Sequence, residues 1–533
     1  MRLSFNPVPA IIGSLSLEEK VGQMLMIGFS GTSLPVDARN RLESGAAGFV
    51  ALFHYNITSV DQVVALTNDV HACRRPSPMI WTDQEGGNVV QFKEIAATTL
   101  SAMGLAATGK RAMARRAGSI MGREMMSLGV DGVLAPVLDV NTRPDNPIIG
   151  FRAFSDDPVT VTRFGSALAG GLRTGGVATC GKHFPGHGDV GSDSHAGLPV
   201  CTAGADWIHG VHLAPFRALI RAGMLDAVMP AHVVYPEVDA DMASMSSHWL
   251  IQVLRRQLGF RGLIISDCLE MGAVQSHMEV ESAAVRAVRA GVDVLSVTQS
   301  AEAQSRVHRA LVEAVRRGEL PISRVDESLA RILDCKRRRH CLAAPLKRDG
   351  GAAGKRVRSH YAQEFRMAAA SITCVRDRDK VLPLDRRRGL LLVEWKKVVA
   401  TEALSQAVAR SVLESPLKRW FPSVDALMLE LEPELPEDMA MRLKSAAVVV
   451  LAVFSRSPEI QEIQAAAVRK VLRLRPDALV VALGNPYDLR GFPNARTFLA
   501  TYGYRRVQAE ALAAVLAGEV KPRGRLPVKL FRD

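Results

Sequence analysis

The sequence predicts an α/β protein in which a (β/α)8 TIM barrel is followed by a second, smaller α/β sandwich domain. Over the first 340 residues, eight short apolar runs alternate with longer amphipathic stretches, a pattern typical of parallel strands joined by helical crossovers. Polar residues cluster just after the carboxyl ends of these runs, where barrel enzymes build their sites. An unpatterned stretch then separates this region from a second α/β pattern.

The eight expected barrel strands are short and apolar throughout. In order they are Met24–Phe29, Gly48–Phe53, Pro78–Thr82, Gly132–Val137, Val177–Cys180, Ala227–Ala231, Leu263–Ser266 and Val292–Val297. The expected helices between and after them include Val60–Cys73, Lys110–Leu128, Pro158–Arg173, Glu279–Ala290 and Ile322–Arg338.

The chain is predicted to divide into a barrel domain over residues 1–339, a linker over 340–356 and a C-terminal α/β domain over 357–533. The linker is basic, rich in glycine and alanine, and unpatterned. Expected strands of the second domain are Leu390–Val393, Ala447–Phe454, Ala478–Leu483 and Thr497–Thr501, with helices such as Glu462–Leu474 and Val507–Leu516.

Charge and aromatic content argue against nucleic-acid binding. The net charge is +13, and much of the excess lies in two runs, Lys336–Arg339 and Arg386–Arg388. Such runs are usually solvated faces or linkers. Aromatic residues make up only 5% of the chain, so no stacking platform accompanies the basic residues. We therefore expect no nucleic-acid partner.

Cysteine usage and hydropathy predict a cytoplasmic protein without a membrane span. The seven cysteines are scattered and form no CxxC pair, so neither a zinc knuckle nor a disulfide framework is indicated. No apolar run approaches the roughly 18 residues that a membrane span needs. The first twenty residues also lack the apolar core of a secretion signal.

The loop Gly181–Pro199 carries the densest chemistry, with three histidines, two aspartates and two prolines. In an extended segment, side chains two residues apart point the same way, so Asp193 can lie beside His195. That pairing orients an imidazole and raises its pKa, as a general acid/base near neutral pH requires. A metal site or a polar-lined turn is the alternative, because His183, His187 and Asp189 are also plausible ligand types.

Three further residues are candidates because of their positions at or near strand ends. Asp83 follows the third strand, where its carboxylate could grip a sugar hydroxyl or cap the next turn. Arg152 lies between apolar residues and needs a partner, either a protein carboxylate or a ligand. Asp267 follows the seventh strand and is either a nucleophile or an N-cap. We expect Glu85 to be buried and paired rather than catalytic.

These stretches resemble glycoside hydrolase family 3, in the two-domain form of its β-N-acetylglucosaminidase subgroup, over nearly the whole chain. The matching segments are DQEGG (83–87), NPIIGFRAFS (146–155), KHFPGHGD with DSH (182–195), VMPAHVVYP (228–236), LGFRGLIISDCLEM (258–271), ALGNPYDL (482–489) and GRLPVKL (524–530). The combination of KHFPGHG with DSH is specific to this subgroup.

The resemblance implies a retaining double displacement that needs no metal or cofactor. Asp267 would attack the anomeric carbon, while His195, paired with Asp193, would protonate the leaving oxygen and later activate water. The usual retaining pair is two carboxylates; this subgroup replaces one with the Asp–His dyad. The remaining implied residues would hold the hydroxyls of a small carbohydrate substrate; they are Asp83, Arg152, Lys182 and His183.

Two positions depart from the family pattern. Gln91 and Asn88 stand where the family often carries arginines, and this change could weaken sugar binding. A metal-dependent barrel hydrolase, a phosphorylase and a non-catalytic sugar-binding relative are the competing readings. The sequence leaves open whether the natural substrate is a muropeptide, a chitin oligosaccharide or a glycoconjugate.

Overall fold

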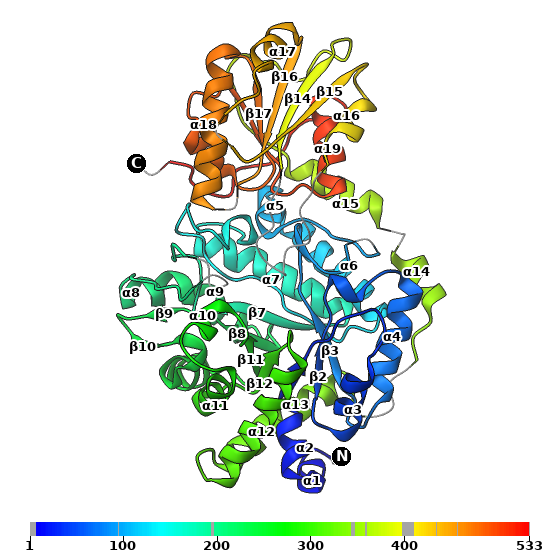
Figure 1. The fold of residues 1–533 in the computed structure, drawn as a ribbon, viewed down its shortest axis with the longest axis vertical. Helices are drawn as coiled ribbons and strands as arrows, with labels where there is room; N and C mark the ends of the chain where they lie inside the picture. The colour runs from blue at the N-terminus through cyan, green and yellow to red at the C-terminus, as the bar shows by residue number, and fades with distance from the viewer. Residues whose placement is uncertain are drawn as a thin grey trace.

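The structure, a computed structural model, has two parts that lie one above the other (Figure 1). It describes residues 7–93, 95–192, 197–342, 347–357, 360–396, 410–432, 434–455 and 457–531. A closed barrel occupies the first part of the chain, and a separate sheet with helices occupies the second. The predicted fold class is confirmed.

The barrel consists of eight parallel strands, in the closed order β1-β12-β11-β8-β7-β6-β3-β2. Each falls on one of the predicted apolar runs: β1 Leu25–Ile27, β2 Phe49–Ala51, β3 Met79–Thr82, β6 Gly132–Val133, β7 Ala178–Phe184, β8 Ala227–Pro230, β11 Leu263–Cys268 and β12 Val294–Val297. Two strands continue beyond their predicted carboxyl ends. Lys182 and His183 lie within β7 and Asp267 lies within β11, because pairing with neighbouring strands continues past the last apolar residue.

Helices cover the outside of the barrel between successive strands (Figure 1). The principal ones are α3 Val36–Ser44, α4 Val60–Ala72, α6 Arg111–Ser127, α7 Pro158–Gly175, α9 Leu213–Arg221, α11 Val280–Ala290, α12 Ala301–Arg316 and α13 Ile322–Arg338, together with a π-helical segment, His248–Gln257. Shorter elements are α1 Val8–Ser14, α2 Leu17–Gly22, α5 Ala102–Ala107, α8 Ala205–Trp207 and α10 Gly272–Gln275. Two small hairpins, β4 Gln84–Gly86 with β5 Val89–Val90 and β9 Val234–Tyr235 with β10 Asp239–Met242, follow β3 and β8.

Buried aspartates tie the strands together at the amino end of the barrel. Asp131, Asp226 and Asp293 directly precede β6, β8 and β12. The Oδ2 atom of each accepts a hydrogen bond from a backbone N–H of the neighbouring strand, namely Ile80 at 2.8 Å, Thr179 at 3.2 Å and Ile264 at 3.0 Å. Each carboxylate thereby gives a hydrogen-bond partner to a buried backbone N–H group that water cannot reach.

The basic run Lys336–Arg339 was predicted as a solvated face or linker; Arg337 and Arg338 are exposed, in keeping with a solvated face, but for Lys336 the prediction is wrong. Lys336 is 0% exposed, and its Nζ donates to Gln23 Oε1 at 2.7 Å. Arg338 and Arg339 form ion pairs with the buried Asp226. The helical period of α13 turns Lys336 toward the apolar stripe of Leu329 and Ile332, whereas Arg337 stays exposed.

The second part contains a six-stranded sheet, within the described residues, in the order β13-β18-β17-β16-β14-β15. Strands β14 Leu390–Trp395, β16 Val448–Val453, β17 Leu479–Ala482 and β18 Thr497–Ala500 match the predicted ones, whereas β13 Thr373–Asp377 and β15 Val424–Leu429 were not predicted. The helices are α15 Tyr361–Ser371, α16 Glu414–Lys418, α17 Met439–Ser445, α18 Pro458–Leu474 and α19 Arg506–Leu516. They flank the sheet on both faces (Figure 1).

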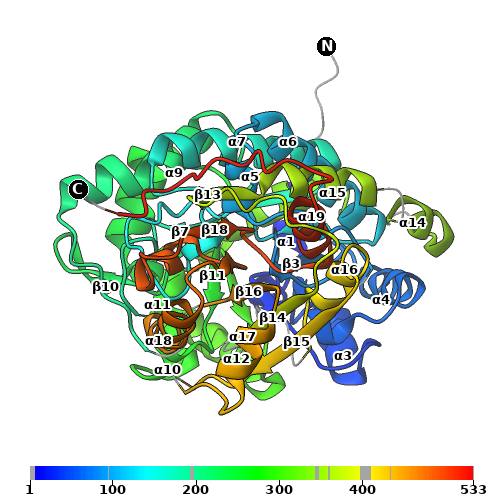
Figure 2. The same cartoon turned by 90° about the horizontal axis from the view of Figure 1, so that it is seen from above.

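The stretch predicted as an unpatterned linker contains a helix, α14 Gly350–Val357. Asn68 of α4 fixes the chain just before it, because Asn68 accepts from the Arg348 N–H at 2.9 Å and donates to the Arg348 carbonyl at 3.1 Å. Seen from above, the second part lies over the barrel (Figure 2). Within the described residues, no helix is long and apolar enough to cross a membrane.

Candidate active site

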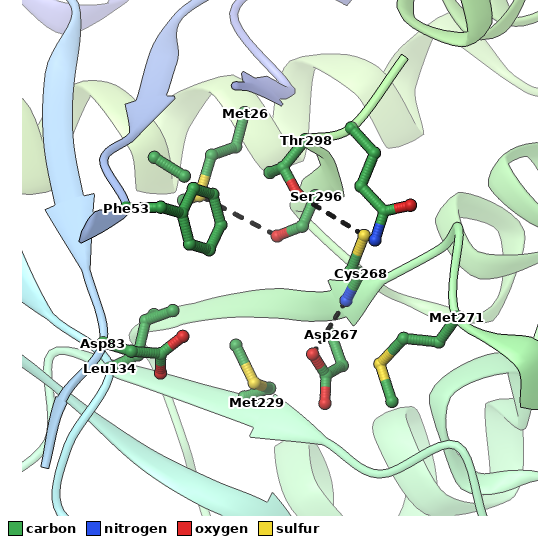
Figure 3. Close-up of a pocket in the computed structure, with 12 residues that line it drawn as sticks. Met26, Phe53, Asp83, Leu134, Met229, Asp267, Cys268, Met271, Ser296 and Thr298 are labelled. Carbon is green, nitrogen blue, oxygen red and sulfur yellow. Dashed lines mark hydrogen bonds between the residues drawn. The ribbon is translucent and has the colours of Figure 1, made fainter. Parts of the chain in front are cut away.

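A cavity of about 120 Å³ opens at the carboxyl end of the barrel strands (Figure 3). Asp83 and Asp267 lie on opposite sides of it, with Met229 between them. The other lining residues come mainly from the ends of β1, β2, β11 and β12 and are largely apolar; they are Met26, Ala51, Phe53, Leu134, Cys268, Met271, Ser296, Thr298 and Gln299. The cavity therefore offers two carboxylates to a ligand within a largely apolar wall.

Asp83 belongs to a network of paired charges rather than standing alone. It follows β3 directly, and its Oδ1 accepts from Lys182 Nζ at 2.5 Å. The same Nζ lies 2.7 Å from Glu85 Oε1. Lys182 reaches both carboxylates from β7, on the opposite side of β6 from β3, so the network joins two strands of the barrel.

Arg152 closes the network through a two-point ion pair with Glu85. Its Nη2 lies 2.7 Å from Glu85 Oε1, and its Nε lies 3.0 Å from Glu85 Oε2. The partner of Arg152 is thus a protein carboxylate, one of the two alternatives, and Glu85 is buried and paired as predicted. Two cations meet two carboxylates, so the network has no excess charge.

At Glu85, Lys182 and Arg152, the neighbouring opposite charges change the pKa more than burial does. Burial alone would raise the pKa of Glu85, but Arg152 and Lys182 lower it to about 2. Burial would lower the pKa of Lys182, yet Asp83 and Glu85 hold it above its ordinary value. Burial opposes the charge of Arg152 as well, and Glu85 again reverses the effect. These groups stay charged at neutral pH and can bind hydroxyls by charge-assisted hydrogen bonds.

His183 is held by Asp139, a residue absent from the predicted site. Asp139 Oδ2 lies 2.7 Å from His183 Nδ1, and Asp139 Oδ1 accepts from the His187 N–H at 2.6 Å. Burial alone would raise the pKa of Asp139, but His183 brings it below its usual value. The bond fixes the ring through Nδ1 and leaves Nε2 as its other polar atom. The polar run after the fourth strand was the signal that could have identified Asp139.

Asp267 sits in β11 with its carboxylate at the cavity. Its Oδ1 accepts from the Cys268 N–H at 2.8 Å. The alternative role, capping the next helix, does not apply, because α10 begins at Gly272 with Met271 at its N-cap position. The neighbouring Cys268 thiol is a poor competitor for nucleophilic chemistry, since burial and then the charge of Glu270 raise its pKa to about 12.

The predicted dyad of Asp193 and His195 lies outside the described residues. The segment leading to it is well fixed. Asp189 Oδ2 accepts from Trp207 Nε1 at 3.1 Å, and a side chain at Gly188 would come within 1.8 Å of the Val140 carbonyl oxygen. The loop thus starts from a defined position beside His187.

Gln91 and Asn88, the two departures from the family pattern, are both buried. Gln91 Oε1 accepts from the His54 N–H at 2.9 Å, so this side chain supports the loop after β2. Among the described residues, no group of three or more His, Cys, Asp or Glu side chains could hold a metal ion.

Comparison with known proteins establishes the family. The pattern of the glycosyl hydrolase family 3 N-terminal domain matches residues 16–335. The chain therefore belongs to glycoside hydrolase family 3, a class consistent with the barrel and its acidic cavity.

Three individual relatives, one of them a solved structure, are similar to this chain. The solved structure of a family 3 β-N-acetylglucosaminidase from Paenibacillus sp. str. FPU-7 is similar with a TM-score of 0.87 and 31% identity, over 97% of this chain and 99% of that one. Beta-hexosaminidase A of Pseudoalteromonas piscicida is 28% identical over 96% of this chain and 97% of its own. A beta-hexosaminidase of Hydrogenovibrio crunogenus is 39% identical over 53% of this chain and 81% of its own.

Proposed function

We propose that this family 3 glycosidase is a retaining β-N-acetylglucosaminidase that releases terminal β-linked N-acetylglucosamine. The observation that carries the proposal is that the Asp267 and Asp83 carboxylates line one cavity, and that Asp83 is held there by the network of Lys182, Glu85 and Arg152. Similarity along the whole chain to proteins described as β-N-acetylglucosaminidase and beta-hexosaminidase supports the same substrate.

The reaction follows from what each side of the cavity can do. Asp83 and Lys182 hold the sugar hydroxyls, and His183 adds a further polar atom through Nε2. Asp267 attacks the anomeric carbon, giving a covalent glycosyl intermediate as in other retaining glycosidases. His195, oriented by Asp193, protonates the leaving oxygen and then takes a proton from the attacking water.

The substrate is a soluble fragment of the cell-wall muropeptide or chitin type, and the reaction takes place in the cytoplasm without a metal or cofactor. The seven free cysteines fit a reducing compartment. The His183 imidazole is accounted for by its contact with Asp139 rather than by metal binding.

An assay of purified protein tests this function directly. Aryl β-N-acetylglucosaminide and aryl β-glucoside are compared, each with and without phosphate, and with and without a chelator. The proposal expects preference for the N-acetylglucosaminide, free N-acetylglucosamine as product, and no effect of chelator. A sugar phosphate as the main product in the presence of phosphate would favour a phosphorylase instead.

A further inference from the structure

The second part of the chain contacts both segments that carry the charge network. The first segment, here the sugar-binding hairpin, is residues 83–90 with β4 and β5, and it holds Asp83 and Glu85. The second, here the Arg152 loop, is residues 141–155. The Glu85–Arg152 ion pair joins the two, so a shift of either segment would move the network as a whole.

Arg505 binds the back of the sugar-binding hairpin from the start of α19. Its Nη2 donates to the Asn88 carbonyl at 3.2 Å, and its Nε lies 3.4 Å from the Gly87 carbonyl. These two carbonyls belong to the turn between β4 and β5. One guanidinium therefore binds the turn at two successive peptide groups.

The opposite face of the turn rests on residues 98–101, which are themselves bound to the second part. The Gly87 N–H donates to the Thr98 carbonyl at 3.1 Å, and Ser101 Oγ donates to the Tyr502 carbonyl at 2.6 Å. Gly86, at φ +105°, packs so closely that a side chain would come within 2.3 Å of the Leu100 carbonyl oxygen. The turn is thus enclosed between residues 98–101 and the segment Tyr502–Arg505.

The Arg152 loop is held from the same side. Phe151, next to Arg152, meets Phe454 edge to face, with ring centroids 6.1 Å apart. Asn141 Nδ2 donates to the Tyr487 hydroxyl at 3.3 Å, while Asn141 Oδ1 accepts from the Gly150 N–H at 3.1 Å. The sugar-binding hairpin and the Arg152 loop, which the Glu85–Arg152 ion pair joins, are therefore both in contact with residues of the second part of the chain.

We propose that Arg505 of the second domain is a positioning residue for the hairpin that carries Asp83 and Glu85. The inference rests on the proposed sugar-binding role of that network. Because sugar recognition depends on geometry within a fraction of an ångström, loosening the hairpin is expected to weaken substrate binding more than the chemical step. Arg505 itself need not touch the sugar.

The chain offers a matched control in the adjacent residue. Arg506 has a side chain that is 75% exposed and bonds through Nε to Glu510 of its own helix, so Arg506→Ala removes the same kind of side chain without touching the hairpin. The variants to compare are Arg505→Ala, Arg505→Lys and Arg506→Ala in the full chain. The readouts are hydrogen exchange of peptides covering 84–92, KM and kcat on aryl β-N-acetylglucosaminide, and the melting temperature.

Arg505→Ala should speed hydrogen exchange in the hairpin and raise KM about three- to tenfold with a smaller change in kcat. Arg505→Lys should fall between Arg505→Ala and the wild type, and Arg506→Ala should match the wild type. Hairpin exchange and KM in Arg505→Ala equal to those of Arg506→Ala would overturn the inference. Exchange is measured on the free protein, so a wild type inactive on N-acetylglucosaminides would refute the proposed function while the hairpin result still decides the role of Arg505.

Discussion

Two clusters of buried charges, one at each end of the barrel, respond to burial in opposite ways. At the carboxyl end, Asp83, Glu85, Lys182 and Arg152 form close, many-sided pairs and stay charged. At the amino end, burial dominates for three groups that lie close together. It raises the pKa of Asp131 to about 7, lowers that of Lys336 to about 8 and lowers that of His71 to about 4.

The difference lies in the partners of each group. Lys182 faces two carboxylates, whereas the Lys336 ammonium bonds to the neutral amide of Gln23 and lies 5.3 Å from the ring centroid of Phe49. A buried charge persists only where an opposite charge compensates for lost water. Perturbed pKa values alone therefore do not mark the functional end of this barrel; the persistence of paired charge beside a cavity does.

The largest expected effect is at Asp267, the carboxylate on the other side of the cavity from the network. Asp267→Asn should reduce kcat by about 10³-fold or more, because Asp83, the other carboxylate lining the cavity among the described residues, is held in an ion pair with Lys182. The measurement is turnover of aryl β-N-acetylglucosaminide, with folding checked by melting temperature. Loss of only a fewfold would show that the reacting group lies elsewhere.

The next effect concerns His195 and depends on the leaving group. His195→Ala should lose about 10²- to 10⁴-fold on a disaccharide, whose leaving oxygen needs protonation, and far less on a nitrophenyl glycoside, which scarcely does. Asp193→Ala should show the same contrast more mildly. If both substrates slow by the same factor, His195 shapes the loop and is not the acid/base.

A pair of lysine variants tests the comparison between the two ends. Lys182→Met leaves Asp83 and Glu85 without their shared cation and should abolish measurable sugar binding while lowering the free energy of unfolding by about 3–5 kcal/mol. Lys336→Met places an apolar chain in an apolar site and should keep full activity, with stability unchanged or higher by about 1–4 kcal/mol. Similar losses of activity in both variants would remove the distinction between the clusters.

The dependence of stability on pH gives the smallest but most specific signal. The pKa of Lys336 is about 8 in the folded chain and ordinarily 10.5. Between these values the unfolded chain binds the extra proton, so the free energy of unfolding should rise with pH for the wild type relative to Lys336→Met.

Glu85 gives the same sign of dependence at the acidic side. Its pKa of about 2 lies below the ordinary 4.5, so its stabilising contribution is present above pH 4.5 and is lost as pH falls toward 2. Urea unfolding of the wild type from pH 2 to 4.5 follows the Glu85 effect, and the difference between wild type and Lys336→Met from pH 8 to 10.5 measures the Lys336 effect. A difference between the proteins that stays constant from pH 8 to 10.5 would contradict the Lys336 assignment.

The apolar runs predicted the barrel well because strands buried on both faces are nearly continuous in hydrophobicity. The prediction stopped early at β7 and β11, where the strands continue through the candidate site residues Lys182, His183 and Asp267. In the second domain, the edge strand β15 was missed since its middle residues are partly exposed and break the apolar run.

The site was predicted as separate residues, not as a network. Position at a strand end indicated Asp83 and Asp267, and an apolar setting indicated that Arg152 needs a partner. The identity of that partner, and the contact of Asp139 with His183, depend on strands that are distant in sequence. Lys336 was missed for a different reason: it lies in a run of four basic residues, which predicts exposure, but the helical period turns its side chain inward.

The most direct test of the central claim is to trap the glycosyl intermediate on the protein with a 5-fluoro N-acetylglucosaminyl reagent, followed by peptide mapping. The structure predicts a single label on Asp267, in the peptide that contains β11, and protection by N-acetylglucosamine. A label on Asp83 or Asp139 would contradict the assignment of the two sides of the cavity.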